Sequence, residues 1–458
     1  MSVEFLQALE ALVGGDALIT GQSAGPYCED RRGRYFGEAL AVVFPSDTIQ
    51  VSQVVRLCAS RRIPIVPQGG NTSLCGASVP LQGMDQIVLN LSKMNRIVAV
   101  DPVNYTMTVE AGCKLASIYE AAEGAGRLFP LGLTAIAPHC EIGGNLSTNA
   151  GGIGVLRYGN ARDLVLGLEV VLPDGRIWNG LRGLRKDNTG YDLKHLFVGA
   201  EGTLGIITKA VLKLYPKPKS SISACVAIEN PEAAVNLLAH MRSCCALSGF
   251  EIMSRNCLEL VFRHVPDTRE PFDKTYPWYL LIRADDVEAG TVSAALREFG
   301  VLEHAVSDDP GQTEQWWRLR RNISDAQKSE GVSIKHDVSV PVSRVADFIG
   351  QASRDLRERF AGIRIVAFGH MGDGNIHYNA SMPDASNAAF IEGHEQEVNR
   401  IVYEVVRRLE GSISAEHGLG QLKRDTIRDY KDPLELELMR RIKDAFDPLG
   451  LMNPGKVI

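Results

Sequence analysis

Short apolar runs separated by glycine, proline and asparagine dominate the first half of the chain. From residue 40 to about residue 215 these runs have the length of a β-strand, as in ALAVVFP, RIPIVPQGG, DQIVLNL, YTMTVEAG and LGLEVVLPDG. Helical periodicity appears only in places, at residues 49–60 and 115–125. Strand-length apolar runs with turn residues between them predict a strand-rich α+β domain.

The pattern changes at YPKPKSS, residues 215–221, where two prolines and a polar run predict a linker. Beyond it, longer helical segments at 231–245, 313–330 and 388–409 alternate with the strand-like runs WYLLIRA and IRIVAF. This alternation predicts a second α+β domain. We therefore expect domains at 1–218 and 219–420, followed by a C-terminal segment at 421–458 that begins as a helix and ends in NPGKVI.

Length and charge exclude several classes of protein. The 458 residues favour two or three domains. With 49 basic and 55 acidic residues the net charge is −6, so no basic field is available for nucleic acid or an anionic membrane. The N-terminus carries Glu4 and Glu10 on an amphipathic pattern, which argues against a secretory signal. No apolar run reaches the roughly 18 residues of a membrane span. The nine cysteines form no CxxC pair, which indicates reduced thiols in a soluble, cytoplasmic enzyme.

Three segments of the first domain are rich in glycine and short polar residues. They are PQGGNTSLCG (67–76), CEIGGNLSTNAGGIGVLRYG (140–159) and AEGTLGIIT (200–208). Neither GxGxxG nor GxxxxGK[ST] is present, so the two most familiar nucleotide loops are excluded. One such segment could be a plain tight turn. Three of them, with backbone able to approach an anion closely, predict a large phosphate-bearing cofactor.

The second domain holds a group of residues suited to a divalent metal. IRIVAFGHMGDGNIHYN predicts a strand, a turn and a strand, so that His370 and His377 can meet across a hairpin and His377 shares a face with Asn379. Imidazoles beside a carboxylate are typical ligands of a transition metal, although isolated histidines are more often structural. In SAEHGLG, an extended chain would point Glu416 and His417 in opposite directions, so both can serve one site only if the site passes between them or Gly418 bends the backbone.

Two further segments carry basic side chains. WWRLRRNISDAQ predicts one helix, on which Trp317, Arg320 and Ser324 share a face. In VSIKHDVSVPV, Lys335 faces away from Ile334 and Val338. The alternatives to a binding role are a solvated basic helix for the first segment and an exposed strand lysine for the second.

The motifs together resemble a known family. PQGGNTSLCG, IGGNLSTNAGG, DNTGYDLKHLFVGAEGTLGIIT, HMGDGNIHYN, SAEHGLG and NPGK are similar in sequence and order to the FAD-linked oxidases of the vanillyl-alcohol oxidase type, in the branch of D-2-hydroxyacid dehydrogenases. The resemblance implies an FAD-binding domain of two α/β subdomains, a substrate (cap) domain with an antiparallel sheet, and a C-terminal helical segment that returns to the flavin.

The resemblance also assigns residues. It implies that FAD is bound by Gly69, Gly70, Asn71, Thr72, Ser73, Gly143, Gly144, Asn145, Thr148, Gly152, Gly202, Ile207 and Asn453. Because Asn71 lies where covalently linked members have a histidine, we expect the FAD to be non-covalent. The implied metal ligands, with zinc expected, are His370, His377 and Glu416, and His417 is the general base. The implied substrate-binding residues are Arg320, Ser324, Lys335 and Asn379, with Ser324 in place of the usual threonine.

The function that follows is oxidation of a D-2-hydroxy acid to the 2-oxo acid by hydride transfer to flavin. We expect D-2-hydroxyglutarate or D-malate, because a substrate with one carboxylate would leave Arg320 and Lys335 as buried cations without a partner. The alternatives are a D-lactate dehydrogenase, a glycolate oxidase flavin subunit, a metal-dependent hydrolase and a non-catalytic subunit of a redox complex. An electron-transfer flavoprotein or a quinone is the expected electron acceptor, and a homodimer is possible on these grounds.

Overall fold

A computed structural model describes residues 2–133, 136–384 and 386–458. The chain divides into two compact units. The first contains residues 1–151, 159–217 and 416–458, and the second contains 152–158 and 218–415. The change at 217/218 falls within the predicted linker, whereas the inclusion of 152–158 in the second unit was not predicted. No helix in the described part of the chain is both long and apolar enough to cross a bilayer.

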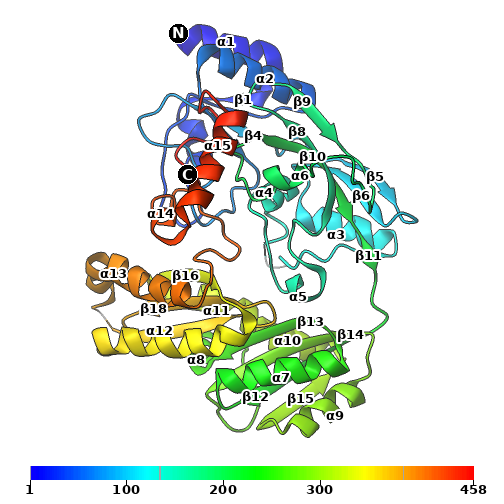
Figure 1. Ribbon diagram of the computed structural model, residues 1–458, viewed down its shortest axis with the longest axis vertical. Helices are drawn as coiled ribbons and strands as arrows, with labels where there is room; N and C mark the ends of the chain where they lie inside the picture. Colours follow the sequence, from blue (N-terminus) through cyan, green and yellow to red (C-terminus); the bar gives the residue numbers. More distant parts are fainter. Residues whose placement is uncertain (1, 134–135, 385) are drawn as a thin grey trace. The chain divides into compact units, whose positions relative to one another are not determined.

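The first unit contains two larger sheets and short helices (Figure 1). Its strands are β1 (Leu18–Ile19), β2 (Ala41–Val43), β3 (Ile65–Gln68), β4 (Ile87–Asn90), β5 (Ile97–Asp101), β6 (Thr106–Glu110), β7 (Arg127–Leu128), β8 (Val165–Val171), β9 (Ile177–Gly180), β10 (Ile206–Lys213) and β11 (Tyr215–Pro216). Its helices are α1 (Ser2–Val13), α2 (Thr48–Arg61), α3 (Leu115–Gly124), α4 (Ile142–Ser147), α6 (Lys194–Phe197), α14 (Ile427–Tyr430) and α15 (Pro433–Phe446), with 3-10 turns η1 (Gly15–Ala17) and η2 (Gly21–Tyr27).

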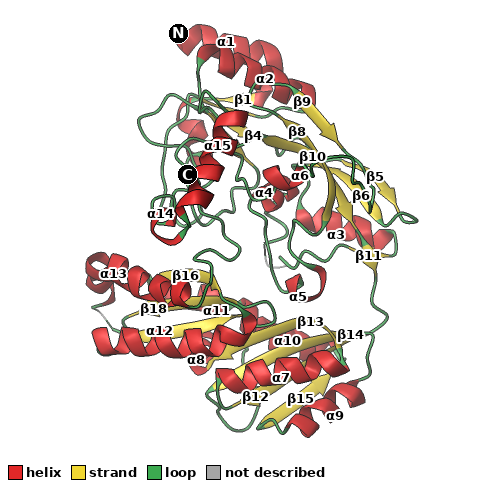
Figure 2. Cartoon of the chain, in the orientation of Figure 1, coloured by secondary structure: helices red, strands yellow, loops and turns green. Residues whose placement is uncertain are grey.

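The two larger sheets of this unit differ in direction. One has the order β1-β2-β4-β3, and its strands β2, β4 and β3 are parallel. The other, β5-β6-β10-β8-β9, is antiparallel throughout. Helices α1 and α2 pack together (Figure 2). The core between them and the first sheet includes Phe5, Val51, Val55 and Leu89, all 1% exposed or less.

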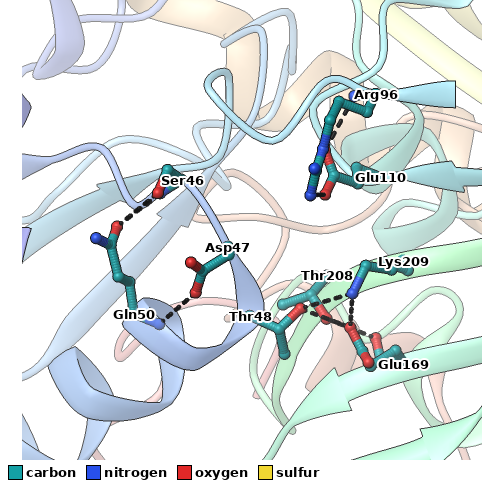
Figure 3. Close-up of polar contacts among 9 residues, drawn as sticks. All are labelled: Ser46, Asp47, Thr48, Gln50, Arg96, Glu110, Glu169, Thr208 and Lys209. Carbon is teal, nitrogen blue, oxygen red and sulfur yellow. Dashed lines mark hydrogen bonds and ion pairs between the residues drawn. The ribbon is translucent and has the colours of Figure 1, made fainter. Parts of the chain in front are cut away.

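A buried carboxylate joins α2 to the second sheet (Figure 3). Asp47 caps α2 by accepting a hydrogen bond from the backbone N–H of Gln50 (2.9 Å). At the first residue of the helix, Thr48 donates to Glu169 Oε1 (2.6 Å), which also accepts from Thr208 Oγ1 and Lys209 Nζ, both at 2.9 Å. Burial disfavours the charge of Glu169, but these three donors outweigh burial and lower its pKa.

The second unit is built on one sheet with the strand order β15-β12-β14-β13-β17-β18-β16, antiparallel throughout. Its strands are β12 (Ser221–Ile228), β13 (Ala246–Ser254), β14 (Trp278–Asp285), β15 (Glu303–Ser307), β16 (Ile334–Ser339), β17 (Arg364–His370) and β18 (Asn375–Ser381). Its helices are α5 (Val155–Tyr158), α7 (Pro231–Cys244), α8 (Arg255–His264), α9 (Ala289–Phe299), α10 (Pro310–Arg321), α11 (Ile323–Ser329), α12 (Val345–Arg359) and α13 (Asn387–Arg408), with η3 (Val342–Arg344).

Strand alternation divides the side chains of this sheet between two faces. On one face, Val366, Phe368 and Met253 pack under α8, α10 and α11 with Trp317 and Ile323. On the other face, His336 Nε2 donates to Asn399 Oδ1 of α13 (2.9 Å), and the hydroxyl of Tyr378 is bonded to that of Ser353 of α12 (3.0 Å). The first of these faces also carries the polar residues of the candidate site.

The predicted α+β class and the antiparallel sheet of the second unit are confirmed. The predicted hairpin around MGDGN is also present, as β17 and β18. The single helix predicted over 313–330 was wrong. It is divided at Asn322, whose φ of −91° and ψ of 0° separate α10 from α11.

Candidate active site

The three glycine-rich segments converge in the first unit. The first segment follows β3 at the carboxyl end of the parallel strands, where ligands of open α/β sheets commonly bind. A Cβ at Gly70 would collide with the carbonyl oxygen of His139, beside the second segment. A Cβ at Gly202, in the third segment, would lie 3.0 Å from Cγ of Pro67. The absence of a side chain at Gly70 and at Gly202 therefore lets the three segments pack closely against one another.

The C-terminal tail completes this arrangement. Asn453 donates to the carbonyl oxygens of Ala77 (3.0 Å) and Glu201 (2.7 Å), so it links the tail to the first and third segments. Several buried polar atoms around it have no hydrogen-bond partner among the described residues: Asn145 Oδ1, Asn453 Oδ1, Glu141 Oε2 and Lys456 Nζ. Buried polar atoms are rarely left unpaired, so this region fits a polar ligand with several hydrogen-bonding groups, as FAD has.

The other predicted FAD residues are distributed along the same segments. Asn71 takes a φ of 50°, and its side chain donates to the carbonyl of Glu29 (2.7 Å) and accepts from Ser78 (2.8 Å). Ile207 lies buried in β10, opposite Val170. The remaining ones follow β3 (Gly69, Thr72, Ser73), lie in or just after α4 (Gly143, Gly144, Thr148), or begin the short segment that belongs to the second unit (Gly152).

Sequence reasoning missed Glu201. Its carboxylate is buried and accepts hydrogen bonds from the backbone N–H groups of Leu419 (2.7 Å) and Gly420 (2.9 Å). Burial raises its pKa to about 7, although those two donors oppose the shift. Glu201 thereby fixes the backbone just beyond His417. A carboxylate within AEGTLGIIT was the available signal, but its partners lie more than 200 residues away.

In the second unit, the strand register gathers the predicted residues on one face. Lys335 of β16 lies directly opposite Asn379 of β18, and Asp337 lies opposite His377. Directly opposite residues of an antiparallel pair point to the same side. The predicted sharing of a face by His377 and Asn379 is therefore confirmed. Asn379 is buried and donates to Gln327 of α11 (2.7 Å), and Lys335 is half-buried.

Four side chains could hold a metal ion. Donor atoms of Asp337, His377, Glu416 and His417 all lie within 4.8 Å of one another. Backbone bonds between β16 and the segment after α13 place the last two, because Ser412 and Ser339 exchange hydrogen bonds and Ala415 N–H donates to the carbonyl of Asp337 (3.2 Å). Two imidazoles and two carboxylates are a donor set that suits zinc or a similar divalent metal.

This group differs from the predicted one in three respects. His370, predicted as a ligand, is not in it, and His417, predicted as the base, is in it. Asp337 was missed, although it shares a strand face with Lys335; Asn375 Nδ2 orients it by donating to Oδ1 (2.9 Å). Glu416 and His417 both reach the group, and Gly418 takes the positive φ of 76° that a bend requires.

His370 lies beside the group, and its ring centroid is 5.6 Å from that of His377. Its Nδ1 is 2.7 Å from Oε1 of Glu251, a fully buried residue of β13. The other oxygen of Glu251 accepts from Nε of Arg320, also at 2.7 Å. Burial disfavours the charge of Glu251, but the adjacent His370 and Arg320 outweigh burial and lower its pKa.

Two expectations about the substrate residues were wrong. Arg320 is not a buried cation without a partner, because Glu251 already pairs with it and Phe368 lies under its guanidinium, 4.8 Å away. The shared face of Trp317, Arg320 and Ser324 required one continuous helix. The helix is divided at Asn322, and Ser324 is exposed whereas the other two are buried.

Family models match both parts of the chain. Residues 39–180 match an FAD binding domain, and residues 217–457 match the C-terminal domain of FAD linked oxidases. The chain belongs to the FAD-linked oxidases. It is accordingly an FAD-dependent oxidoreductase.

Curated relatives narrow the comparison. The chain is 38% identical to a protein named probable D-2-hydroxyglutarate dehydrogenase, mitochondrial, from Oryza sativa subsp. indica, over 94% of this chain and 77% of that one. It is 37% identical to the D-2-hydroxyglutarate dehydrogenase of Bos taurus, over 100% of this chain and 84% of that one. A bacterial enzyme of the same name, from Xanthomonas citri pv. viticola, is 34% identical over 94% and 92%.

Solved structures agree on the fold. The p-cresol methylhydroxylase structure has a TM-score of 0.77 at 19% identity and covers 99% of this chain and 96% of its own. The 4-ethylphenol oxidase of Gulosibacter chungangensis has a TM-score of 0.76 at 18% identity, with the same coverage. These likenesses confirm the fold predicted from the resemblance to the vanillyl-alcohol oxidase type.

Proposed function

We propose that this FAD-linked oxidase oxidises D-2-hydroxyglutarate to 2-oxoglutarate at a site that also holds a divalent metal, with zinc expected. The observation that carries the proposal is the group formed by Asp337, His377, Glu416 and His417. The relatives from rice, cattle and Xanthomonas, which are named D-2-hydroxyglutarate dehydrogenases, support the choice of substrate. A metal-dependent hydrolase would not account for the FAD binding domain at residues 39–180.

Oxidation of a 2-hydroxy acid removes a proton from the hydroxyl oxygen and a hydride from C2. When bound, the metal would supply a Lewis acid at the hydroxyl, and FAD would supply the acceptor of the hydride. His417 would take the hydroxyl proton, which requires its ring to be neutral at the start. Of the group, Asp337, His377 and Glu416 would hold the metal, and His370, which lies beside the group, would be a further ligand. Asn379, fixed by Gln327, would orient the hydroxyl or the C1 carboxylate.

The second carboxylate of the substrate would be bound by Lys335 and Arg320. The ion pair with Glu251 uses Nε of Arg320, so the Nη groups are the donors that would face a substrate. Because Glu251 compensates the charge of Arg320, a monocarboxylic acid would leave less charge unbalanced than the sequence suggested. We therefore expect a preference for the diacid of about tenfold, with much of it carried by Lys335.

The remaining assignments are proposals too. D-malate is a second diacid that the same groups would bind. An electron-transfer flavoprotein or a quinone would reoxidise the flavin, and the protein would form a homodimer. We propose a cytoplasmic location for this chain, whereas its relatives from rice and cattle are named as mitochondrial enzymes.

A substrate panel tests the function. The purified chain would be assayed by reduction of an artificial dye with the D and L forms of 2-hydroxyglutarate, malate and lactate, and with glycolate. We expect the highest kcat/KM for D-2-hydroxyglutarate. Equal or higher kcat/KM for D-lactate would overturn the substrate assignment, and absence of dye reduction with every acid would favour a non-catalytic subunit.

A further inference from the structure

Glu251 is the one charged residue of β13, a strand that is otherwise almost entirely buried. It lies in β13 within the sequence SGFEIMS and is 1% exposed. Isolated buried charges are costly, so a buried carboxylate requires partners. Glu251 has two, and they come from different elements: Arg320 from the last turn of α10 and His370 from the end of β17, each at 2.7 Å.

The strand register explains why Glu251 meets His370. Ile252 of β13 pairs with Gly369 of β17, so the preceding residue, Glu251, is aligned with His370. Arg320 approaches from α10, which covers this face of the sheet. The same Arg320 lies over Phe368, and the ring of Phe368 is 5.0 Å from that of His377. The carboxylate is therefore in direct contact with one proposed metal ligand and one proposed substrate residue.

The hydrogen bond to Glu251 fixes the state of the imidazole. An ionised carboxylate can only accept, so Nδ1 of His370 must carry the proton. In the neutral form of the ring the lone pair is then on Nε2, so Nε2 is the atom through which His370 would ligate a metal. Carboxylates that hold the second nitrogen of a ligating histidine set its orientation, and their loss typically lowers metal affinity by about 10–100-fold.

We infer that Glu251 is a positioning residue that orients His370 toward the metal and Arg320 toward the distal carboxylate of the substrate at the same time. The inference rests on the proposed function, since it requires the metal and the diacid. It goes further in assigning a role to a residue that contacts neither of them. A substitution of Glu251 should consequently change both the metal affinity and the recognition of the diacid, although Glu251 would touch neither the metal nor the substrate.

The test is Glu251→Gln, which keeps the size of the side chain and removes its charge. The matched control is Glu330→Gln. Glu330 in the same unit also lies between a histidine and arginines, contacting His264 and Arg263 through Oε1 and Arg364 through Oε2, all at 2.6 Å. Its ion pairs are with residues other than His370 and Arg320, so Glu330→Gln measures the general effect of losing such a cluster. Glu251→Asp retains the charge that compensates Arg320, but it is one methylene too short to hold both partners.

Zinc affinity of the flavin-containing protein is measured by competition with a chromophoric chelator, and cobalt substitution gives a visible spectrum of the ligand field. We expect Glu251→Gln to bind zinc about 10–100-fold more weakly and to alter the cobalt spectrum. We also expect the ratio of its KM values for D-2-hydroxyglutarate and D-lactate to depart from the wild-type ratio, because the orientation and the charge balance of Arg320 both change. Glu330→Gln should resemble the wild type in all three measurements.

The outcomes separate the inference from the proposed function. Wild-type zinc affinity and cobalt spectrum in Glu251→Gln, or an equal loss in Glu330→Gln, would overturn the role of Glu251 while the metal site stands. If Glu251→Gln does not fold, Glu251→Asp decides by the same measurements. A wild-type protein whose zinc binding is absent, or is unchanged by His377→Ala, refutes the proposed metal site itself.

Discussion

The burial of Lys456 in the C-terminal tail has an energetic cost that can be measured. Its side chain is 1% exposed, and its Nζ has no hydrogen-bond partner among the residues that the structure describes. Burial lowers its pKa from 10.5 to about 7. At 1.36 kcal/mol per pH unit, this difference corresponds to roughly 5 kcal/mol of cost to the folded state when the amine is charged. We therefore expect Lys456→Met, which has a similar length and no charge, to stabilise the flavin-free protein.

The sign of the pH dependence follows from linkage. Below pH 7 the amine is charged in both states, so the folded wild type bears the whole cost. Between pH 7 and 10.5 the unfolded chain binds a proton that the folded chain does not, so wild-type stability rises with pH. The advantage of Lys456→Met should consequently be largest at pH 6, at several kcal/mol, and should decrease steadily at pH 7.5, 9 and 10.

The free energy of unfolding would be measured by urea titration, followed by circular dichroism and by tryptophan fluorescence, because two compact units need not unfold together. Lys186→Met, at an exposed lysine of the same unit, is the control and should change stability little at any pH. A Lys456→Met variant that is less stable at pH 6, or whose advantage does not depend on pH, would refute the reasoning.

Three further results are expected. Acid precipitation should release the yellow flavin into the supernatant, because the amide of Asn71 is bonded to Glu29 and Ser78 and is not a nucleophile; colour retained in the pellet would contradict this. Chelation should reduce dye-linked activity by about 100-fold or more while the flavin absorbance remains, and activity should recover on adding zinc, manganese or cobalt. Full activity in a sample shown by elemental analysis to be metal-free would rule out a role for the metal. Glu169→Gln should lower the free energy of unfolding of the first unit by about 3 kcal/mol at pH 7, measured by urea titration. This difference should shrink as the pH falls through the lowered pKa of Glu169, because the contribution of a carboxylate with a lowered pKa is lost on protonation.

Local patterns predicted the parts of the structure that depend on local interactions. The hairpin of β17 and β18 follows from two apolar runs around MGDGN, and the apposition of His370 and His377 follows from that hairpin. The division at Asn322 could not be predicted in the same way. Neither proline nor glycine occurs in WWRLRRNISDAQ, so no helix-breaking residue marks the point where α10 ends and α11 begins.

Residues that depend on long-range pairing were missed. Asp337 reaches His377 because β16 pairs with β18, and Glu251 reaches His370 because β13 pairs with β17 across more than 100 residues. The sequence contains no local signal for the order of strands in a sheet. Once the order is known, the period of two decides which side chains meet, and a register shift of one residue would move Asp337 to the opposite face.

Glu251 shows what a sequence can still reveal without the strand order. A carboxylate in an apolar strand has to be paired, yet a buried ion pair adds little stability, and replacing one by apolar residues of similar volume is often neutral or stabilising. Stability alone therefore does not account for a charge at this position in β13. Because its partners are Arg320 and His370, the physical consequence of the charge is to fix the orientation of both, and that consequence concerns the chemistry of the site more than the fold. A polar residue that violates the apolar pattern of its own strand is thus a reason to look for the groups it holds in place.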